Sequence, residues 1–400
     1  MNQNKNLKAG EQANDFSNSR NFFCKLKIGN ANIKPMFIMS IVIREWIFDL
    51  IPRLELTIAD DGTMHEAFNL EDQTEITIEL SRTNTEEGSV TETFILDNWS
   101  VDYLIGGGKV IYTITAIKKA ENLFFPIRTR SFKNKTSIKV LEQIANECKL
   151  IPDILTGLST NDSMTWIQCN TTNFNMIKHV LKRANVNDDA FLSFIDMDNK
   201  LRITSLKKEC QKKAVANAKF SIENVTADAF AETADANTIW YNGYMMKNIM
   251  GTYNKQFGYG AKYSYYDLTK NVIASTPDTA FAPFTTNDFQ HGDTVENINY
   301  GLLTDNVFSD YFKSQINNKY YKNISFGNKL SLAINSLYPI KLLDRVNVSI
   351  PSTQRTGWLN EVYSGDYIVC GILHNADYQG VFQKEISLHR NGFNDNPYGV

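Results

Sequence analysis

The chain has 400 residues, of which 42% are hydrophobic and 21% charged, and its formal net charge is -3. This composition is typical of a globular protein with two or three domains, and the charge is too close to neutral to attract nucleic acid or a membrane by itself. No apolar run approaches the ~20 residues of a membrane span. Residues 1–20 lack the apolar core of a signal peptide, so we expect a flexible polar tail there.

The five cysteines are scattered, and none forms a CxxC pair. An odd number of dispersed cysteines argues against a disulfide framework or a zinc site. We therefore expect reduced and mostly buried thiols at Cys24, Cys148, Cys169, Cys210 and Cys370.

Residues 21–120 read almost entirely as strands. Apolar and polar residues alternate in 54–58, 74–81 and 110–115, which indicates half-buried strands. Strands are also predicted at 93–96 and 99–103. Gly106–Gly108 joins the strand at 99–103 to the one at 110–115, so a hairpin turn is predicted there in place of a phosphate loop. Roughly six or seven short strands separated by turns predict a sandwich or a barrel.

Residues 121–207 change character. A helix is predicted from Thr136 or Ser137, with an apolar face of Ile138, Leu141, Ile144, Ala145 and Cys148. A strand at 164–169 then leads to a second helix, capped within Thr171–Asn173 and apolar at Phe174, Ile177, Val180, Leu181 and Ala184. A buried strand at 191–195, a turn at Asp198–Asn199 and a strand at 201–206 complete an α/β insertion.

The rest of the chain returns to strands. Residues 207–217 form a basic linker, and the strand signal resumes between 219 and 244. Residues 245–299 are rich in Tyr, Asn, Thr and Gly with little periodicity, and they are predicted to form a long loop-like insertion. A helix at 304–318 is followed by predicted strands at 320–324, 329–334, 345–350, 364–374 and 382–391.

The segment from Met164 to Leu206 also carries a resemblance. Its polar cap Thr171–Asn173, the aromatic Phe174, the apolar helix, the Phe-rich strand and the short Asp-containing turn resemble the core of contractile-tail hub proteins. These are the bacteriophage baseplate hub and the hub half of type VI secretion spike proteins. The family usually has an acidic residue before the aromatic, where this chain has Asn173. The final strands of the chain, RVNVSI and the hairpin from Tyr367 to Leu388 with its predicted turn at 378–380, resemble the end of the second hub barrel.

The resemblance implies a fold that is mainly β with an α/β insertion: two tail-tube-like β-barrel or sandwich domains plus a small helix-and-hairpin domain. The expected division is a tail at 1–20, a first tube-like β domain at 21–120, an α/β insertion at 121–207, a second tube-like β domain at 208–243 and 301–391, an aromatic-rich insertion at 244–300, and a tail at 392–400.

The resemblance also implies a function. A homotrimer would form a pseudo-sixfold ring that adapts a hexameric tail tube to a trimeric spike, with a central channel. Its partners would be the tail tube protein, the spike protein, the tape measure protein and other baseplate proteins, with genome DNA only in transit and no membrane. The protein would be part of the virion tail baseplate and assembled in the host cytoplasm.

No residue pattern predicts catalysis, a metal or a cofactor. His179 lies in a predicted helix without an HExxH motif, and His374 and His389 lie in predicted strands, so structural roles are expected. Cys169 precedes a helix N-terminus, which can lower a thiol pKa, but the sequence pairs no histidine with it.

Two charged patterns have the same ordinary explanation. Asp60–Asp61 and Asp188–Asp189 sit in predicted turns and are expected to be solvated, since a pair of catalytic carboxylates would have to face each other across a substrate. The basic run Lys207–Lys213 is expected to be solvated as well.

Tyrosines in the 245–299 segment are the candidate interface residues. Aromatic side chains in a glycine-bearing segment are typical of protein interfaces and of sugar stacking, and they can equally pack the insertion onto its own domain. The sequence leaves both open for Tyr253, Tyr259, Tyr263, Tyr265 and Tyr266. A carbohydrate- or receptor-binding tail protein that uses this insertion is therefore the alternative to a hub, and an enzyme of a β-rich class is a further one.

Overall fold

The structure is a computed structural model. It describes residues 22–60, 70–82, 85–104, 109–186, 189–220, 237–248, 261–267, 272–276, 295–301, 308, 311, 314–315, 318, 326–335, 338–352, 358–377 and 382–390. The predicted turns at 106–108 and 378–380, the predicted strand at 320–324 and both predicted tails lie outside these residues.

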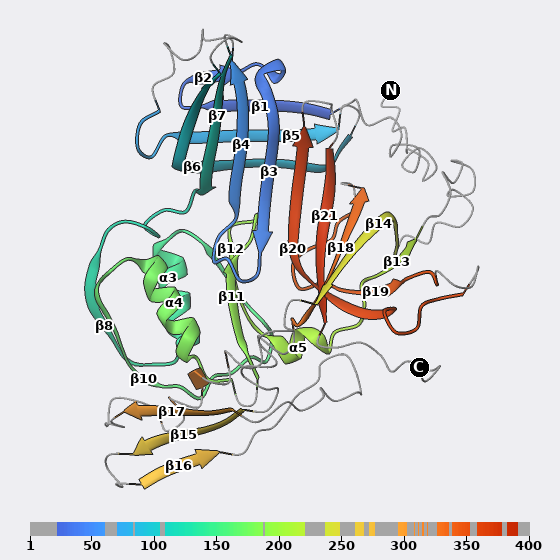
Figure 1. The fold of residues 1–400 in the computed structure, drawn as a ribbon. Helices are drawn as coiled ribbons and strands as arrows, with labels where there is room; N and C mark the ends of the chain where they lie inside the picture. The colour runs from blue at the N-terminus through green and yellow to red at the C-terminus, as the bar shows by residue number, and fades with distance from the viewer. Residues whose placement is uncertain are drawn as a thin grey trace, which may run out of the picture.

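One continuous sheet of 13 strands runs through both β-rich parts of the chain (Figure 1). The first β unit contains β1 (Phe22–Ile28), β2 (Ala31–Ile33), β3 (Ile38–Trp46), β4 (Arg53–Asp60), β5 (Glu75–Arg82), β6 (Thr85–Leu104) and β7 (Lys109–Lys118). The second β unit contains β13 (Ala216–Phe220), β14 (Thr238–Asn248), β18 (Asn328–Asn335), β19 (Arg345–Ser349), β20 (Gly365–Asp377) and β21 (Phe382–Arg390). The order is β19-β13-β14-β18-β21-β20-β3-β4-β7-β6-β5-β1-β2. The mainly β fold with few helices, predicted from the sequence, is confirmed.

The second β unit closes on itself, because β19 also pairs with β20. Closure removes the unpaired edge strands that an open sheet would leave. The alternating residues Leu330, Leu332 and Ile334 of β18 are fully buried in the core of this barrel, beside Val346 and Val348 of β19.

The first β unit has the alternation that the sequence predicts. Leu54, Leu56 and Ile58 of β4 are fully buried, while Glu55 and Thr57 between them are not. The predicted strands at 93–96 and 99–103 are one long strand, β6, whose register with β7 shifts between Leu96 and Asn98. A bulge of this kind bends a strand without ending it, which the sequence pattern alone cannot distinguish from a turn.

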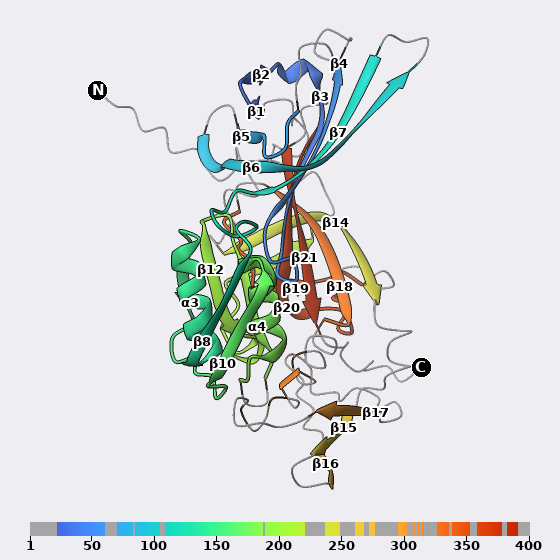
Figure 2. The same ribbon diagram turned by 90° about the vertical axis from the view of Figure 1, so that its left-hand side faces the viewer.

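The α/β unit lies beside the sheet, and its helices pack together (Figure 2). It contains β8 (Arg128–Lys135), α3 (Ser137–Glu147), β9 (Ile151–Ile154), β10 (Met164–Thr171), α4 (Asn173–Arg183), β11 (Phe191–Ile195), β12 (Lys200–Ser205) and α5 (Leu206–Cys210). All five residues of the predicted α3 face are buried. No described helix is long and apolar enough to cross a membrane.

Both longer helices begin at the predicted caps. Thr136 accepts a hydrogen bond from the amide of Lys139, and Thr172 accepts one from Asn175. Asn173 is therefore the first residue inside α4 and not its cap. Its buried amide accepts hydrogen bonds from Arg130 and Gln168 and donates to the carbonyl of Asn122, so it needs both an acceptor and a donor. An acidic side chain would lack that donor.

The C-terminus of α4 is capped from far along the chain. The side-chain amide of Asn318 donates to the carbonyl of Ala184 at 2.8 Å, and its oxygen accepts a hydrogen bond from the amide of Phe191 at 2.8 Å. The hydroxyl of Ser314 donates to the carbonyl of Arg183. These contacts satisfy carbonyls that a helix end leaves without partners. Of the predicted helix at 304–318, the structure describes five residues, and residues 311, 314, 315 and 318 are helical.

Two segments differ from the sequence prediction. The basic run that begins at residue 207 starts within a short helix, α5, whose Leu206 and Cys210 are buried. Within the predicted loop-like insertion, the chain forms a separate sheet of β15 (Ala261–Asp267), β16 (Val272–Thr276) and β17 (Val295–Gly301). Strands rich in Tyr, Asn and Thr lack the apolar alternation that identifies a half-buried strand, which explains the second difference.

The two β units meet where β3 pairs with β20, which we call the seam. Gly371 lies directly opposite Trp46 at one end of this pairing. A Cβ atom built on Gly371 would lie 2.1 Å from Cε3 of Trp46, so the indole ring occupies the space that any other side chain would need. The ring packs edge-on against His389 of β21.

A Gly371→Ala substitution is expected to destabilise the protein, because the added methyl group must displace the Trp46 ring. We expect a loss of about 1–3 kcal/mol in the free energy of unfolding, as for other overpacked positions. Gly243→Ala in β14 is the matched control, since a Cβ atom there meets nothing within 4 Å. Urea denaturation of both variants measures the difference, and equal stabilities would contradict the role given to Gly371.

Candidate functional site: a charged junction between three units

A cavity of about 290 Å³ lies where both β units meet the α/β unit. Its lining comes from β3 and β6 of the first unit, from β11, β12 and the turn between them, and from β20, β21 and residues 340–342 of the second unit. The charged and titratable residues that line it are Glu45, Glu92, Asp196, Asp198, Arg202, Lys341, His374 and Lys384.

Lys118 of β7 lies beside this cavity and is 1% exposed. Its ammonium group pairs with the carboxylate of Glu92 and donates a hydrogen bond to the carbonyl of Met197 at 2.9 Å. Met197 belongs to the turn between β11 and β12, so one buried cation joins the first β unit to the α/β unit. A buried charge is tolerated only with such partners.

Glu45 of β3 makes the corresponding contacts toward the second β unit. Its Oε1 lies 3.7 Å from Nε2 of His374 on β20, and its Oε2 accepts a hydrogen bond from the amide of Met197 at 3.3 Å. Both side chains are largely buried. The carboxylate of Glu45 therefore contacts all three units.

Lys384 of β21 is the second buried lysine of the junction. Its ammonium group donates to the carbonyl of Tyr338 at 2.6 Å. Burial lowers the pKa of Lys384 to about 8, and the charge of Glu45 opposes that shift. The charged form is thus less stable in the folded protein than in the unfolded chain.

Arg202 of β12, which also lines the cavity, bridges two carboxylates. It bonds Asp196 with an N–O distance of 2.9 Å and also pairs with Asp153 of β9. The charged groups of the junction therefore bind one another or backbone carbonyls. These bonds fix the positions of the three units relative to one another. Among the described residues, no group of three or more His, Cys, Asp or Glu could hold a metal ion.

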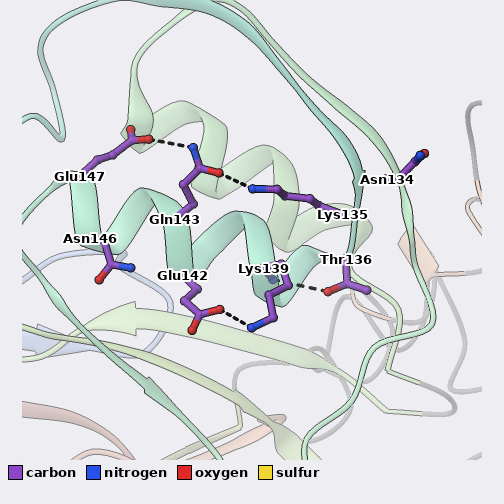
Figure 3. A pocket seen from close by; sticks show the side chains of 8 residues that line it. All are labelled: Asn134, Lys135, Thr136, Lys139, Glu142, Gln143, Asn146 and Glu147. Carbon is purple, nitrogen blue, oxygen red and sulfur yellow. Dashed lines mark hydrogen bonds and ion pairs between the residues drawn. The ribbon is translucent and has the colours of Figure 1, made fainter.

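A second, open hollow of about 610 Å³ follows α3 (Figure 3). Its charged side chains already have partners: Lys135 bonds Gln143, Lys139 bonds Glu142, and Glu147 bonds Gln143 and Arg130. The hollow therefore presents a self-paired polar surface.

The histidines are placed as structural residues. Burial, together with the charges of Arg183 and Lys182, lowers the pKa of His179 to about 4, and the ring lies edge-on to Trp166. Burial lowers the pKa of His389 to about 4 as well. Both rings are neutral at pH 7.

Four of the five cysteines are buried, and Cys169 is exposed on β10. Burial raises the pKa of Cys24 and of Cys148 to about 11, and it raises the pKa values of Cys210 and Cys370 further. These four thiols are therefore protonated at pH 7.

The expectation of solvated turn acids is wrong for two residues. Asp60 is 1% exposed at the end of β4, and Asp189 is 5% exposed. Asp189 accepts hydrogen bonds from the amides of Ala190 and Lys207, the latter in the first turn of α5. It is buried because it caps that helix, which the sequence did not reveal. Asp61 and Asp188 lie outside the described residues.

The tyrosines predicted as interface residues separate into two groups. Tyr253 and Tyr259 lie outside the described residues. Tyr263, Tyr265 and Tyr266 belong to the strand β15. None of the three belongs to the junction, and the junction residues themselves were not predicted, because no spacing motif connects them.

The buried pair at Lys118 predicts a clear stability difference. The substitution Lys118→Met leaves the carboxylate of Glu92 without its cation. Breaking a buried ion pair typically lowers the free energy of unfolding by about 3 kcal/mol or more. The neighbouring Lys119 pairs with Glu75 on the surface, so Lys119→Ala should change the free energy of unfolding by about 1 kcal/mol at most. Chemical denaturation of both variants tests this contrast. A Lys118→Met protein as stable as Lys119→Ala would refute it.

Lys384 predicts a dependence on pH. Since its pKa is about 8 in the folded protein and near 10.5 in the unfolded chain, the unfolded chain binds more protons between these values, and stability rises with pH there. Relative to Lys384→Met, the wild type should gain up to about 1 kcal/mol per pH unit between pH 8 and 10. Urea denaturation of both proteins across this range measures the gain, and a flat difference would contradict the assignment.

Known proteins resemble this chain in structure and not in sequence. No protein-family model and no curated protein matches the sequence. The 43 kDa tail protein of prophage MuSo2 from Shewanella oneidensis is similar over 92% of this chain and 98% of its own, with a TM-score of 0.57 and 12% identity. The tail protein from Neisseria meningitidis MC58 is similar over 93% of this chain and 97% of its own, with a TM-score of 0.55 and 10% identity. At the level of the fold, these likenesses confirm the resemblance found in the sequence: over nearly its whole length, this chain has the fold of phage tail proteins.

Proposed function

We propose that this chain is a structural hub protein of a contractile-tail baseplate. Three copies form a ring with pseudo-sixfold symmetry, and the ring adapts a hexameric tail tube to a trimeric spike. Its central channel passes the tape measure protein and the genome during assembly and injection. The protein acts in the virion tail and is assembled in the host cytoplasm.

The observation that carries this proposal is the continuous sheet across the seam. Residues 40–46 of β3 pair with residues 371–377 of β20, so two β units stand side by side within one chain. Three such chains would present six units to a tube of six subunits, while the chain itself repeats only three times. The tube-like domains would be residues 21–120 and residues 208–243 with 301–391.

The end of the sheet supports a ring. Its last strand, β2, has three residues and pairs only with Leu26–Ile28 of β1. Within the part of the chain that the structure describes, the first residues of β1 have a neighbouring strand only on the β5 side. An edge left open in this way is an aggregation risk in a monomer, and a neighbouring copy in a closed ring would cover it.

The junction supports a structural role over an enzymatic one. Its buried cations bind carboxylates or carbonyls of neighbouring strands, which fixes the relative position of the three units. The tail tube, spike, tape measure and other baseplate proteins are the partners that such a ring would contact.

The expected result is a particle with three times the chain mass of 45.5 kDa in light scattering, seen as a ring with a central hole in negative stain. Three copies with six similar β units in projection would agree with the proposal. A strict monomer at high concentration that also fails to assemble with a tail tube protein and a spike protein would refute it.

A further inference from the structure

The two β units share one strand topology. In the first unit the strand order is β3-β4-β7-β6-β5, and in the second it is β14-β18-β21-β20-β19. The strands of the two series follow one another along the chain in the same sequence, and every neighbouring pair is antiparallel. By this correspondence β14 is the counterpart of β3, and β20 is the counterpart of β6.

Bulges fall at matching places in these counterpart strands. Each of the four strands has one extra residue against its neighbour, at Leu96–Asn98 in β6, Val369–Gly371 in β20, Ile38–Ile41 in β3 and Tyr241–Tyr244 in β14. Since a bulge tends to keep its place among related domains, the bulges give a residue alignment of the two units. Asn98 is then the counterpart of Gly371, and Tyr244 is the counterpart of Ile41.

The seam uses this correspondence only once. Residues 40–46 of β3 pair with residues 371–377 of β20. The corresponding contact would join β14 to β6, but the chain does not make it. Within the described residues, 98–104 of β6 have a neighbouring strand only in β7. Likewise, 244–248 of β14 have one only in β18, because β13 pairs with β14 over 238–241.

These two half-edges carry exposed apolar side chains. Trp99 and Tyr103 of β6 are 46% and 65% exposed, and Tyr244 and Met245 of β14 are 39% and 48% exposed. Trp99 lies opposite Ile114 of β7, which is fully buried, so the apolar face of the sheet runs out to the edge of β6 without cover. Edges of this kind invite pairing with another strand.

We propose that a second copy of this chain covers both edges: residues 98–104 of β6 in one copy pair with residues 244–248 of β14 in the next copy. The contact repeats the seam between chains. The inference rests on the ring proposed above and names the surfaces that close it. Because the contact joins two different surfaces and every copy offers both, three copies close a ring in which neither half-edge stays open.

The seam also supplies the register of this contact. At the seam, Ala376 of β20 lies opposite Ile41 of β3. Their counterparts are Tyr103 of β6 and Tyr244 of β14, so these two tyrosines lie opposite each other across the boundary between copies. Aromatic residues placed directly opposite each other stabilise a strand pair, and here each tyrosine covers exposed surface of the other.

Opposite charges meet on the other face of the contact. In the same register, Asp102 of β6 lies opposite Met245, and Lys247 of β14 lies opposite Ser100. Asp102 and Lys247 are both exposed, and they are diagonal neighbours across the strand pair, within reach of a long side chain. This charge complementarity favours a second copy of the chain as the occupant of each edge.

The test is disulfide cross-linking of the full-length protein that carries Tyr103→Cys and Tyr244→Cys. Every variant also carries Cys169→Ser, because Cys169 is the exposed native cysteine. Diamide serves as the oxidant that accepts two electrons and two protons from each pair of thiols, with the protein alone and with a tail tube protein and a spike protein. Linked species of two and three chains are expected, and a reductant should return them to the single-chain mass of 45.5 kDa.

The matched control pairs Met36→Cys with Tyr244→Cys. Met36 is 79% exposed and lies outside both edges, so this variant should give at least tenfold less linked protein. As a second readout, Lys247→Glu should weaken association of the copies by about two- to fivefold, and adding Asp102→Lys should restore it.

The outcomes separate this inference from the ring itself. A wild-type trimer whose Tyr103→Cys, Tyr244→Cys variant does not link, or links no more than the control, would overturn the interface and leave the ring standing. Links that continue beyond three chains would keep the strand pairing and overturn the ring of three. A protein that stays monomeric and unlinked under both conditions would overturn both.

Discussion

The architecture depends on one strand that has no solvent-facing side. Every residue of β11 is buried. Phe191 and Ile195 belong to the core that α3 and α4 cover, while Leu192 and Phe194 belong to a second core shared with Ile368 and Cys370 of β20. A strand with two apolar faces cannot be stable at the surface of a separate domain. The α/β unit is therefore integrated with the second β unit by hydrophobic burial and not merely tethered to it.

The buried charges give this association its geometry. Apolar surfaces stabilise contact but tolerate sliding, whereas Lys118 and Glu45 lose their partners if either β unit shifts relative to the turn at Met197. Replacing such groups with apolar residues can preserve stability in other proteins, so their distinctive contribution here is a fixed relative position of three units. The hub role proposed above would require that property.

Local sequence patterns were sufficient to predict most of the helices and strands, but they did not predict how these elements contact one another. The alternation of Leu54, Leu56 and Ile58 and the caps at Thr136 and Thr172 are local signals, and the structure agrees with them. Asn199 also has the left-handed conformation that its place in the predicted turn requires. The junction, by contrast, brings Glu45, Met197 and Lys384 together from three distant parts of the chain, and no spacing rule connects them. The sheet of β15–β17 was missed because β15 and β17 consist largely of tyrosine, asparagine and charged residues and β16 has only five residues, so none of the three shows a sustained apolar alternation.

The cap on α4 has a consequence for synthesis. Asn318 closes the C-terminus of a helix that ends at Arg183, and the seam joins β3 to residues beyond 370. During translation, α4 leaves the ribosome well before Asn318, and the edge of β3 that faces β20 stays unpaired until residues 371–377 have been made. Contacts of such long sequence separation slow folding and lengthen the time for which a strand edge can pair wrongly. The nascent chain of this protein therefore carries an open strand edge from the emergence of β3 until that of β20.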